Sequence, residues 1–295
     1  MTSAEPQIID DKSPLCIPFI TGLLEKRSPQ NGERPFIIGL NGVQGVGKTT
    51  LVKALAETLT NLGHTTLVFS IDDLYLKHED QVALAQSHPD NLLLQQRGEP
   101  GTHDMQLAQA FFDNITSGKP AKVPSYDKAA FSGQGDRLPE SRWAEVNSPG
   151  QRKIQIVIFE GWCVGFRTLP ESEVEAKWKG PSRTLQQHKL EHLLLVNEKL
   201  IGYDIMTNLL DVFIHIDAED TQYVYDWRLQ QEAALRRERG TAMTDEQVLK
   251  FVDGYYPAYE LFSDTVRRGI LPNSPGHQMR LVVGKDRRVK EHFVI

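Results

Sequence analysis

A glycine-rich segment near the N-terminal end carries the clearest chemical signal in the chain. It reads Gly42-Val43-Gln44-Gly45-Val46-Gly47-Lys48-Thr49 and fits G-x-x-x-x-G-K-[ST] at every fixed position. Glycines let backbone N–H groups converge on phosphate oxygens, and the helix expected to begin near Lys48 adds a partial positive charge. We therefore expect ATP phosphates to bind residues 42–49 and Thr50, with Lys48 on the β- and γ-phosphates and the Thr49 hydroxyl on Mg²⁺.

Acidic residues follow two apolar runs that have the character of buried strands. In "HTTLVFSIDDLY" (64–75) the apolar run stops at Asp72 and Asp73, and in "IVIFEGW" (156–162) it stops at Glu160. In open α/β sheets, ligands bind beyond the carboxyl ends of the strands. Successive strand residues point to opposite faces, so one aspartate is expected to face the γ-phosphate while the other caps or orients a loop. Glu160 is expected to hold Mg²⁺, directly or through water.

The carboxylate at the end of the expected strand 154–160 helps to distinguish classes of phosphate-binding protein. A GTPase would carry N-K-x-D after a strand, whereas this chain has only "NEKL" at 197–200. Glu160 followed by Gly161 resembles the small-molecule kinases typified by uridine kinase, phosphoribulokinase and pantothenate kinase. That resemblance implies that Asp72, the first residue of "DDLY", accepts the proton of the attacking hydroxyl, as phosphoryl transfer to an alcohol requires.

Further segments resemble one group of these kinases in particular. They are "RGEPGTHD" (97–104), "VPSYDKAAFSGQGDR" (123–137), "FEGWCVGF" (159–166) and "VYDWRLQQE" (224–232). Their order is similar to that of the D-glycerate 3-kinase group and its fungal ATP-binding relatives, over roughly residues 36–284. The resemblance implies transfer of the γ-phosphate of ATP to a hydroxyl of a small organic acid, most simply D-glycerate.

A short acid needs cationic and hydrogen-bonding groups around it. Guanidinium groups suit a carboxylate, which makes Arg97 and Arg137 candidates. His103, Tyr126 and Lys128 are candidates for binding hydroxyls or the other end of the acid. Each of these residues also has an ordinary structural interpretation, as a surface arginine, a residue beside a helix cap or a loop tyrosine.

The segment "WRLQQEAALRRERG" follows the strand that ends near Asp217, where such kinases place a mobile lid. Arg228 is expected to stabilise negative charge on the transferring phosphoryl group. The later arginines of the segment, Arg236, Arg237 and Arg239, have the simpler interpretation of a solvated helix face with acidic partners.

Strand and helix signals alternate along the chain, which predicts an α/β P-loop NTPase fold with a doubly wound, mostly parallel sheet, helices on both faces and a helical lid. Residues 35–295 are expected to form the kinase domain, after a helical extension at 1–34 with Phe19, Ile20, Leu23 and Leu24 on one face and Pro18 in the first turn. The strands expected are 35–41, 65–71, 154–160 and 211–217, followed by a C-terminal hairpin. The helices expected are 48–63, 104–117, 219–239 and 244–267, with loops at 120–150 and 170–190.

Composition limits the partners of the protein. The chain has 295 residues and a formal net charge of -6, so no broad nucleic-acid surface is expected. No run of about 18 uncharged apolar residues predicts a membrane span, and "MTSAEPQIIDDKSP" has neither an apolar leader core nor an Arg-rich pattern. Cys16 and Cys163 lack metal-type spacing and are expected to be reduced thiols. We expect a cytoplasmic protein, with nuclear localisation also open, whose partners are ATP and a small hydroxy acid.

Two alternatives stay open at this point. One is a uridine- or pantothenate-type kinase with another acceptor, and the other is a non-catalytic ATP-binding regulatory protein. Oligomeric state is not predicted, and for the adenine-binding residues the sequence offers only Gly284 and Lys285.

Overall fold

The computed structural model describes residues 10–27, 34–240 and 242–295, and the statements below refer to these residues. The part of the predicted N-terminal extension at 1–9 and 28–33 lies outside them. A six-stranded sheet in the order β10-β9-β8-β1-β7-β2 forms the centre of the molecule. Its strands are β1 (Phe36–Gly42), β2 (Thr66–Ser70), β7 (Ile156–Gly161), β8 (Val212–Ala218), β9 (Gln278–Val283) and β10 (Val289–Val294). All neighbouring pairs are parallel except β9 and β10, which form the predicted hairpin.

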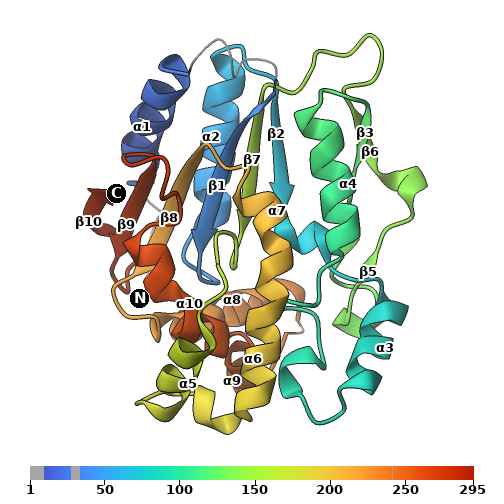
Figure 1. Ribbon diagram of the computed structural model, residues 1–295, viewed down its shortest axis with the longest axis vertical. Coiled ribbons are helices and arrows are strands. Elements are labelled where there is room, and N and C mark those ends of the chain that lie inside the picture. The colour runs from blue at the N-terminus through green and yellow to red at the C-terminus, as the bar shows by residue number, and fades with distance from the viewer. Residues whose placement is uncertain (1–9, 28–33, 241) are drawn as a thin grey trace.

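The middle strands are buried along their whole length. Every residue of β1 and of β8 is buried, so both strands are continuous apolar runs broken by only a few polar residues. This is the pattern expected where helices cover both faces of a parallel sheet. Helix α2 (Lys48–Asn61) packs on β1, β2 and β7, α1 (Ser13–Glu25) packs on α2 and β8, and α10 (Tyr256–Arg268) also contacts β8. In Figure 1, the column formed by α6 (Leu190–Lys199) and α7 (Asp204–Thr207) passes in front of the sheet.

The remaining helices lie mostly beyond the carboxyl ends of the parallel strands. The arrowheads of β1 and β2 point toward the lower half of Figure 1, where α3, α5, α6, α8 and α9 lie. Their bounds, with that of α4 beside β2, are α3 (His78–Ser87), α4 (Met105–Thr116), α5 (Glu171–Lys179), α8 (Tyr223–Arg239) and α9 (Asp245–Asp253). The loops that can form a ligand site in this fold therefore lie between the sheet and this helical half.

Several predicted elements have different bounds in the structure. The helix expected at 244–267 is two helices, because Pro257 lies in the first turn of α10 and has no N–H with which to continue α9. The capping box at Thr244 and Gln247 is present as predicted. Helix α8 begins at Tyr223 instead of 219. Helix α1 begins at Ser13, so Pro18 lies inside it and is not in its first turn.

The two segments predicted to be loops contain regular structure. Residues 120–150 hold two small antiparallel sheets, which pair β3 (Ala121–Val123) with β6 (Ala144–Val146) and β4 (Tyr126–Asp127) with β5 (Asp136–Arg137). Residues 170–190 contain α5, so the loop prediction was wrong there. The signals that predict this helix are two acidic residues in its first turn, two lysines in its last turn and a following glycine.

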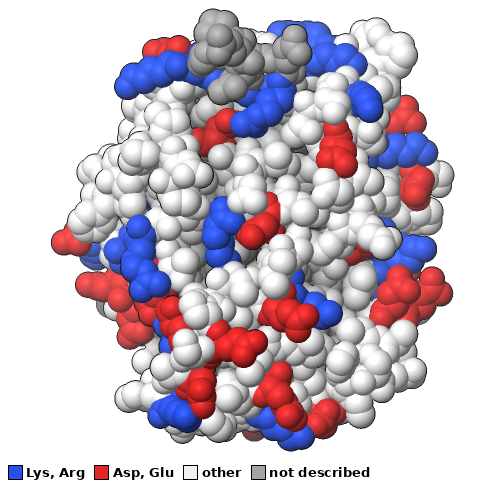
Figure 2. Space-filling view, in the orientation of Figure 1, with Lys and Arg blue, Asp and Glu red and all other residues white. Residues whose placement is uncertain are grey.

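Charges of both signs are interspersed on the face shown in Figure 2, where Lys and Arg side chains lie among Asp and Glu. Both cysteines are buried free thiols. None of the helices formed by the described residues has the length and apolar character needed to cross a bilayer.

Candidate active site

The glycine-rich loop joins β1 to α2, as predicted from the sequence. Gly47 takes a positive φ of 102° as the residue before α2, and Gly45 takes a φ of 79°. A Cβ on Gly45 would lie 2.7 Å from the Cβ of Trp227 in α8. Glycine is therefore required at position 45 both by the backbone conformation and by the close approach of α8.

Side chains around the loop hold its shape. Val43 and Val46 are buried in the core, and the Tyr259 hydroxyl of α10 hydrogen-bonds the Gln44 side chain. Lys48 Nζ donates to the carbonyl oxygens of Gly42 at 2.8 Å and Val43 at 3.3 Å. Thr49 and Thr50 are exposed at the start of α2. The backbone thus forms a turn around the Lys48 ammonium. A phosphate bound in this turn would contact that ammonium group.

Two carboxylates act on Lys48. Burial lowers the pKa of the Lys48 ammonium, whereas the negative charges of Glu160 and Asp72 act in the opposite direction. Glu160 is the penultimate residue of β7 and is paired in register with Leu40 of β1 and Ser70 of β2. The carboxyl ends of three adjacent strands therefore bring Lys48, Asp72 and Glu160 together, as the sequence predicted.

Thr49 and Glu160 suit a hard cation. A hydroxyl and a half-buried carboxylate, next to a loop that binds phosphates, are oxygen ligands of the kind that Mg²⁺ takes while retaining several waters. The chemistry of this donor set fits the predicted metal.

Asp72 and Asp73 lie just beyond the predicted strand, but in a turn and not in the extended conformation from which their opposite directions were predicted. Strand β2 ends at Ser70, and residues Ile71–Leu74 form a 3₁₀ turn whose first N–H groups are capped by the Ser70 side chain, which accepts from Asp72 N at 3.3 Å. The two carboxylates nevertheless separate in role. Asp73 Oδ1 accepts from Tyr126 N at 3.0 Å and so orients the loop, as predicted.

Asp72 is paired on one oxygen only. Its Oδ2 contacts Lys128 Nζ at 2.5 Å, whereas its Oδ1 is buried and has no hydrogen-bond partner among the described residues. Burial is the largest single effect and by itself raises the pKa of Asp72, but the charge and hydrogen bond of Lys128, together with His103 and Lys48, make the net shift downward. Asp73 shows the opposite result, because burial raises its pKa to about 6. Asp72 is therefore the better ionised carboxylate, with one oxygen available to accept a proton.

The segment from Arg97 to Asp104 lies directly against this turn. Its residues pair with the chain after Asp72, since Asp104 N donates to Leu74 O at 2.7 Å and Leu76 N donates to Thr102 O at 3.0 Å. His103 stacks on Tyr75 with ring centroids 4.4 Å apart, and burial lowers the pKa of His103 to about 4. His103 is therefore a neutral, buried side chain beside Asp72.

The two candidate arginines are already bound by protein groups. Arg137 is 8% exposed and contacts Asp104 Oδ2 at 3.0 Å and Tyr75 O at 2.9 Å. Arg97 donates to the carbonyl oxygens of Gly133 at 2.8 Å and of Gln134. Both guanidinium groups therefore hold the 123–137 segment against the 72–76 and 97–104 segments.

Tyr126 and Lys128 belong to the 123–137 segment that these arginines hold. The Tyr126 ring lies against Tyr75, with centroids 5.5 Å apart, and under the Arg97 guanidinium. Of the five predicted substrate residues, Lys128 contacts Asp72 directly, and the charge of Asp72 also acts on the pKa of His103 and of Tyr126.

Arg228 lies in α8, one residue after the tryptophan that contacts Gly45. Its guanidinium pairs with the buried Glu232 at 2.5 Å and lies 4.7 Å from the Phe251 ring centroid of α9. Arg236, by contrast, lies at the surface and pairs with Asp245 at 3.6 Å, which fits the predicted solvated face. Helices α8 and α9 contact each other, so Arg228 is part of the joint between them.

Arg287 was missed by the sequence reasoning. It lies in the turn between β9 and β10, and its Nε donates to Gly45 O of the phosphate-binding loop at 2.7 Å. Lys285, which the sequence suggested for the adenine site, instead pairs with Asp226 at 2.7 Å. Arg287 belongs to the run "GKDRR", and nothing in this local sequence relates it to the phosphate-binding loop.

Asp217 is another carboxylate whose environment the sequence did not predict. It is the penultimate residue of β8 and is bound by two guanidinium groups, Arg267 at 2.9 Å and Arg280 at 2.6 Å. Burial raises its pKa, but the hydrogen bond from Arg267 and the surrounding cations outweigh burial and lower it overall. This network joins β8, β9 and α10.

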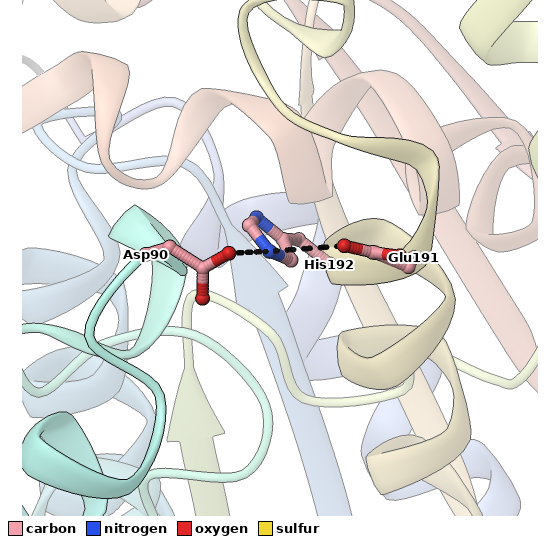
Figure 3. A group of neighbouring side chains, drawn as sticks. All are labelled: Asp90, Glu191 and His192. Carbon is pink, nitrogen blue, oxygen red and sulfur yellow. Dashed lines mark ion pairs between the residues drawn. The ribbon is translucent and has the colours of Figure 1, made fainter.

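A second group of acidic side chains lies away from this site. Figure 3 shows Asp90, Glu191 and His192 converging, with His192 Nε2 at 3.5 Å from Asp90 Oδ2. Lys189 Nζ contacts the same Asp90 oxygen at 2.6 Å and Glu191 at 3.6 Å. The Lys189 ammonium therefore already pairs with both carboxylates, and the cluster joins α6 to the loop after α3 by ion pairs.

Comparisons with known proteins agree with this geometry. No family model matches the chain. An uncharacterized kinase of Schizosaccharomyces pombe is 38% identical over 276 residues, which is 92% of this chain and 96% of that protein. The chloroplastic D-glycerate 3-kinase of Arabidopsis thaliana is 38% identical over 237 residues, covering 79% of this chain and 48% of the plant enzyme. The solved structure of a D-glycerate 3-kinase from Cryptococcus neoformans matches with a TM-score of 0.88 at 33% identity, covering 97% of this chain and all of that one.

Proposed function

Since the chain belongs to the D-glycerate 3-kinase family of P-loop kinases and is an ATP-dependent phosphotransferase with a hydroxyl acceptor, we propose that its acceptor is D-glycerate. The observation that carries the proposal is that only one of the two carboxylate oxygens of Asp72 has a partner. One oxygen contacts Lys128, and the other is buried without a partner near Lys48. A hydroxyl group that donates to the free oxygen would face the phosphates, while a carboxylate on the same small molecule could reach the Lys128 ammonium.

ATP binding involves residues 42–50 in this proposal. Backbone N–H groups of the loop and the Lys48 ammonium contact the phosphates. Arg287, in the turn between β9 and β10, stabilises the loop by a hydrogen bond from its Nε to Gly45 O. Thr49 and Glu160 would hold Mg²⁺, which would supply positive charge against the phosphates.

Phosphoryl transfer needs the acceptor oxygen in line with the γ-phosphorus. The acceptor hydroxyl donates its hydrogen bond to Asp72 Oδ1, and its oxygen forms the new bond to phosphorus while the bond to the β–γ bridging oxygen breaks. The hydroxyl proton passes to the Asp72 carboxylate, and ADP carries away the electron pair of the broken bond. Lys128 helps to keep Asp72 ionised before the reaction, because its charge and its hydrogen bond both lower the pKa of Asp72 against the opposing effect of burial.

The acid is held by Lys128 and His103 in this arrangement. Lys128 is 58% exposed and can move to contact a substrate carboxylate and Asp72 together. Arg97, Tyr126 and Arg137 position the segment that bears Lys128. This revises the expectation that the two arginines bind the acid directly, because both already make short contacts with protein oxygens.

Arg228 supplies charge stabilisation when α8 and α9 close over the phosphates. Its guanidinium exchanges Glu232 for phosphoryl oxygens, and Glu232 retains its second contact, at 3.1 Å from Met243 N. Closure also excludes water, which limits hydrolysis of ATP without an acceptor.

The test is acceptor-dependent formation of ADP with a panel that includes D-glycerate, L-glycerate, uridine and pantothenate. Turnover with D-glycerate well above every other acceptor supports the proposal. Preference for uridine or pantothenate overturns the acceptor and favours the uridine- or pantothenate-type alternative. Tight ATP binding with no acceptor-dependent turnover favours a regulatory role instead.

A further inference from the structure

Tyr203 is a buried tyrosine next to the proposed acceptor site that no sequence signal indicated. It lies in the turn between α6 and α7 and is 2% exposed. Its hydroxyl accepts from Gly101 N at 3.0 Å and lies 2.6 Å from His103 Nδ1. The two residues are 100 positions apart in the chain. The hydroxyl therefore joins the α6–α7 column to the 97–104 segment.

These contacts determine which nitrogen of His103 carries the proton. His103 is neutral, since burial lowers its pKa to about 4, so only one ring nitrogen bears hydrogen. The Tyr203 hydroxyl has one hydrogen to donate, and His103 Nδ1 is the acceptor that lies within reach among the described residues. If Nδ1 carried the proton instead, the hydroxyl hydrogen would be buried without an acceptor, which is costly. The favoured tautomer has Nδ1 as acceptor and hydrogen on Nε2.

The Nε2–H group then has nothing to bind within the protein. Nε2 is buried and has no hydrogen-bond partner among the described residues, and the same holds for Asp72 Oδ1. The two side chains share one environment, since the charge of Asp72 acts on the pKa of His103. The β-bridge between Tyr75 and His103 keeps the two segments in register. A buried donor without a partner and a buried acceptor without a partner thus lie on two adjoining segments of the chain.

We propose that Tyr203 holds His103 as the Nε2–H tautomer. We further propose that this N–H donates to an oxygen of the acceptor that is bonded to the carbon adjacent to the one bearing the reacting hydroxyl. The inference rests on the proposed function and restricts the set of acceptors that the site can bind. Asp72 accepts a hydrogen bond from the hydroxyl that is phosphorylated, and His103 donates one to the oxygen on the adjacent carbon. The site is therefore selective for acceptors with two adjacent oxygen-bearing carbons. His103 is a substrate-binding residue in this account, and Tyr203 is a positioning residue that acts through it.

The measurement is the ratio of kcat/KM for D-glycerate to that for 3-hydroxypropanoate, which lacks the 2-hydroxyl. The wild-type ratio should be large, since a buried donor left without a partner disfavours the deoxy analogue. His103→Leu should lower the ratio by about 10- to 100-fold, mainly through the reaction of D-glycerate. His103→Gln, whose amide can supply an N–H near the Nε2 position, should restore part of the ratio.

Tyr203→Phe should lower the same ratio, by about 10-fold, with the KM for ATP unchanged. Tyr225→Phe is the matched control, because it also removes the hydroxyl of a buried tyrosine, one that contacts Asp253 and Arg183 instead of His103. The control should change thermal stability to a similar degree and leave the ratio as in the wild type. A ratio that is unchanged in both His103→Leu and Tyr203→Phe overturns the inference.

The tautomer can be measured without turnover. Long-range ¹H–¹⁵N NMR of the side chains of the nine histidines, with His103 assigned by loss of its signals in His103→Gln, reports which nitrogen bears hydrogen. Wild-type protein should give protonated Nε2 and unprotonated Nδ1 between pH 6 and 8, and Tyr203→Phe should give a mixture. Protonated Nδ1 in the wild type contradicts the inference, even where D-glycerate is the acceptor. Conversely, a different preferred acceptor contradicts the proposed function and leaves the NMR result to decide the tautomer.

Discussion

The chemistry of this kinase depends on how a few side chains divide their hydrogen bonds. Asp72 and Asp73 are adjacent in sequence, yet Asp73 binds a backbone N–H of the neighbouring loop while Asp72 has one oxygen paired with a lysine and one oxygen free. The 3₁₀ turn after β2 produces this difference, because it points the two carboxylates in different directions. Of these two aspartates, Asp72 is the one that combines a lowered pKa with an unpaired oxygen.

Asp72→Asn should lower kcat by about 10²- to 10⁴-fold and leave the KM for ATP nearly unchanged. The amide is similar in size but cannot take the hydroxyl proton, whereas the phosphate-binding loop remains intact. Steady-state kinetics with ATP and D-glycerate varied separately give the two constants. Asp73→Asn is the matched control, since its amide oxygen can still accept from Tyr126 N. A parallel loss of ATP affinity in Asp72→Asn would show that Asp72 has a different role.

Lys128→Met should move the acidic limb of the kcat–pH profile to higher pH. The charge and the hydrogen bond of Lys128 both lower the pKa of Asp72 against the effect of burial, so removing the ammonium makes this pKa rise. The carboxylate is then protonated, and activity lost, at a higher pH than in the wild type. Lys122→Met, at an exposed position in β3, should leave the profile in place. An acidic limb at the same pH in both variants would contradict the assignment.

At the scale of elements, the phosphate-binding loop is held between two elements from the C-terminal half of the chain. Helix α8 contacts Gly45 through Trp227, and the turn between β9 and β10 contacts its carbonyl through Arg287. The same turn is held by the start of the chain, because Lys12 Nζ donates to Arg287 O at 2.6 Å and Asp11 accepts from Val289 N at 2.8 Å. The loop conformation thus depends on elements distant in sequence.

Arg287→Ala should raise the KM for ATP by about 5- to 20-fold with little change in the KM for D-glycerate. The Gly45 carbonyl loses its hydrogen bond, so the loop samples conformations that bind phosphate less well. Arg288→Ala, at the next and exposed position, serves as the control and should behave as the wild type. If both variants bind ATP equally well in calorimetric titrations, the contact has no part in shaping the loop.

At the scale of the whole molecule, the N-terminal helix is part of the folded core. Cys16 and Ile20 of α1 are fully buried, and α1 packs on α2 and β8. The Asp217 network and α10 cover β8 as well, so the central strands are protected from several sides. We therefore expect α1 to contribute to global stability instead of behaving as an independent appendage.

Ile20→Ala should lower the free energy of unfolding by about 2–5 kcal/mol, because it leaves a cavity between α1 and the helix and strand beneath it. Chemical denaturation followed by circular dichroism measures the change. Leu62→Ala removes a leucine that is 58% exposed and should cost much less. Equal effects of the two substitutions would mean that α1 is not packed as described.

Features encoded by neighbouring residues could be predicted before the structure was known. The phosphate-binding loop, the capping box at Thr244 and the parallel core strands each follow from local spacing, since backbone geometry and burial period act over a few residues. The same locality explains why Lys48, Asp72 and Glu160 were expected at one edge of the sheet. The errors arose where weak helix signals lay in polar sequence, as in α5, or where Pro257 interrupted a periodic pattern.

Contacts between distant segments were decided only by the tertiary structure. Tyr203 lies 100 residues from His103, and Arg287 lies 242 residues from Gly45, so no local pattern could relate them. The same packing bound Arg97 and Arg137 to protein oxygens and left one oxygen of Asp72 free. The physical reason is that a polar group acquires its partner, its burial and hence its pKa from whatever the folded chain places around it, and that neighbourhood is set by packing of the whole domain.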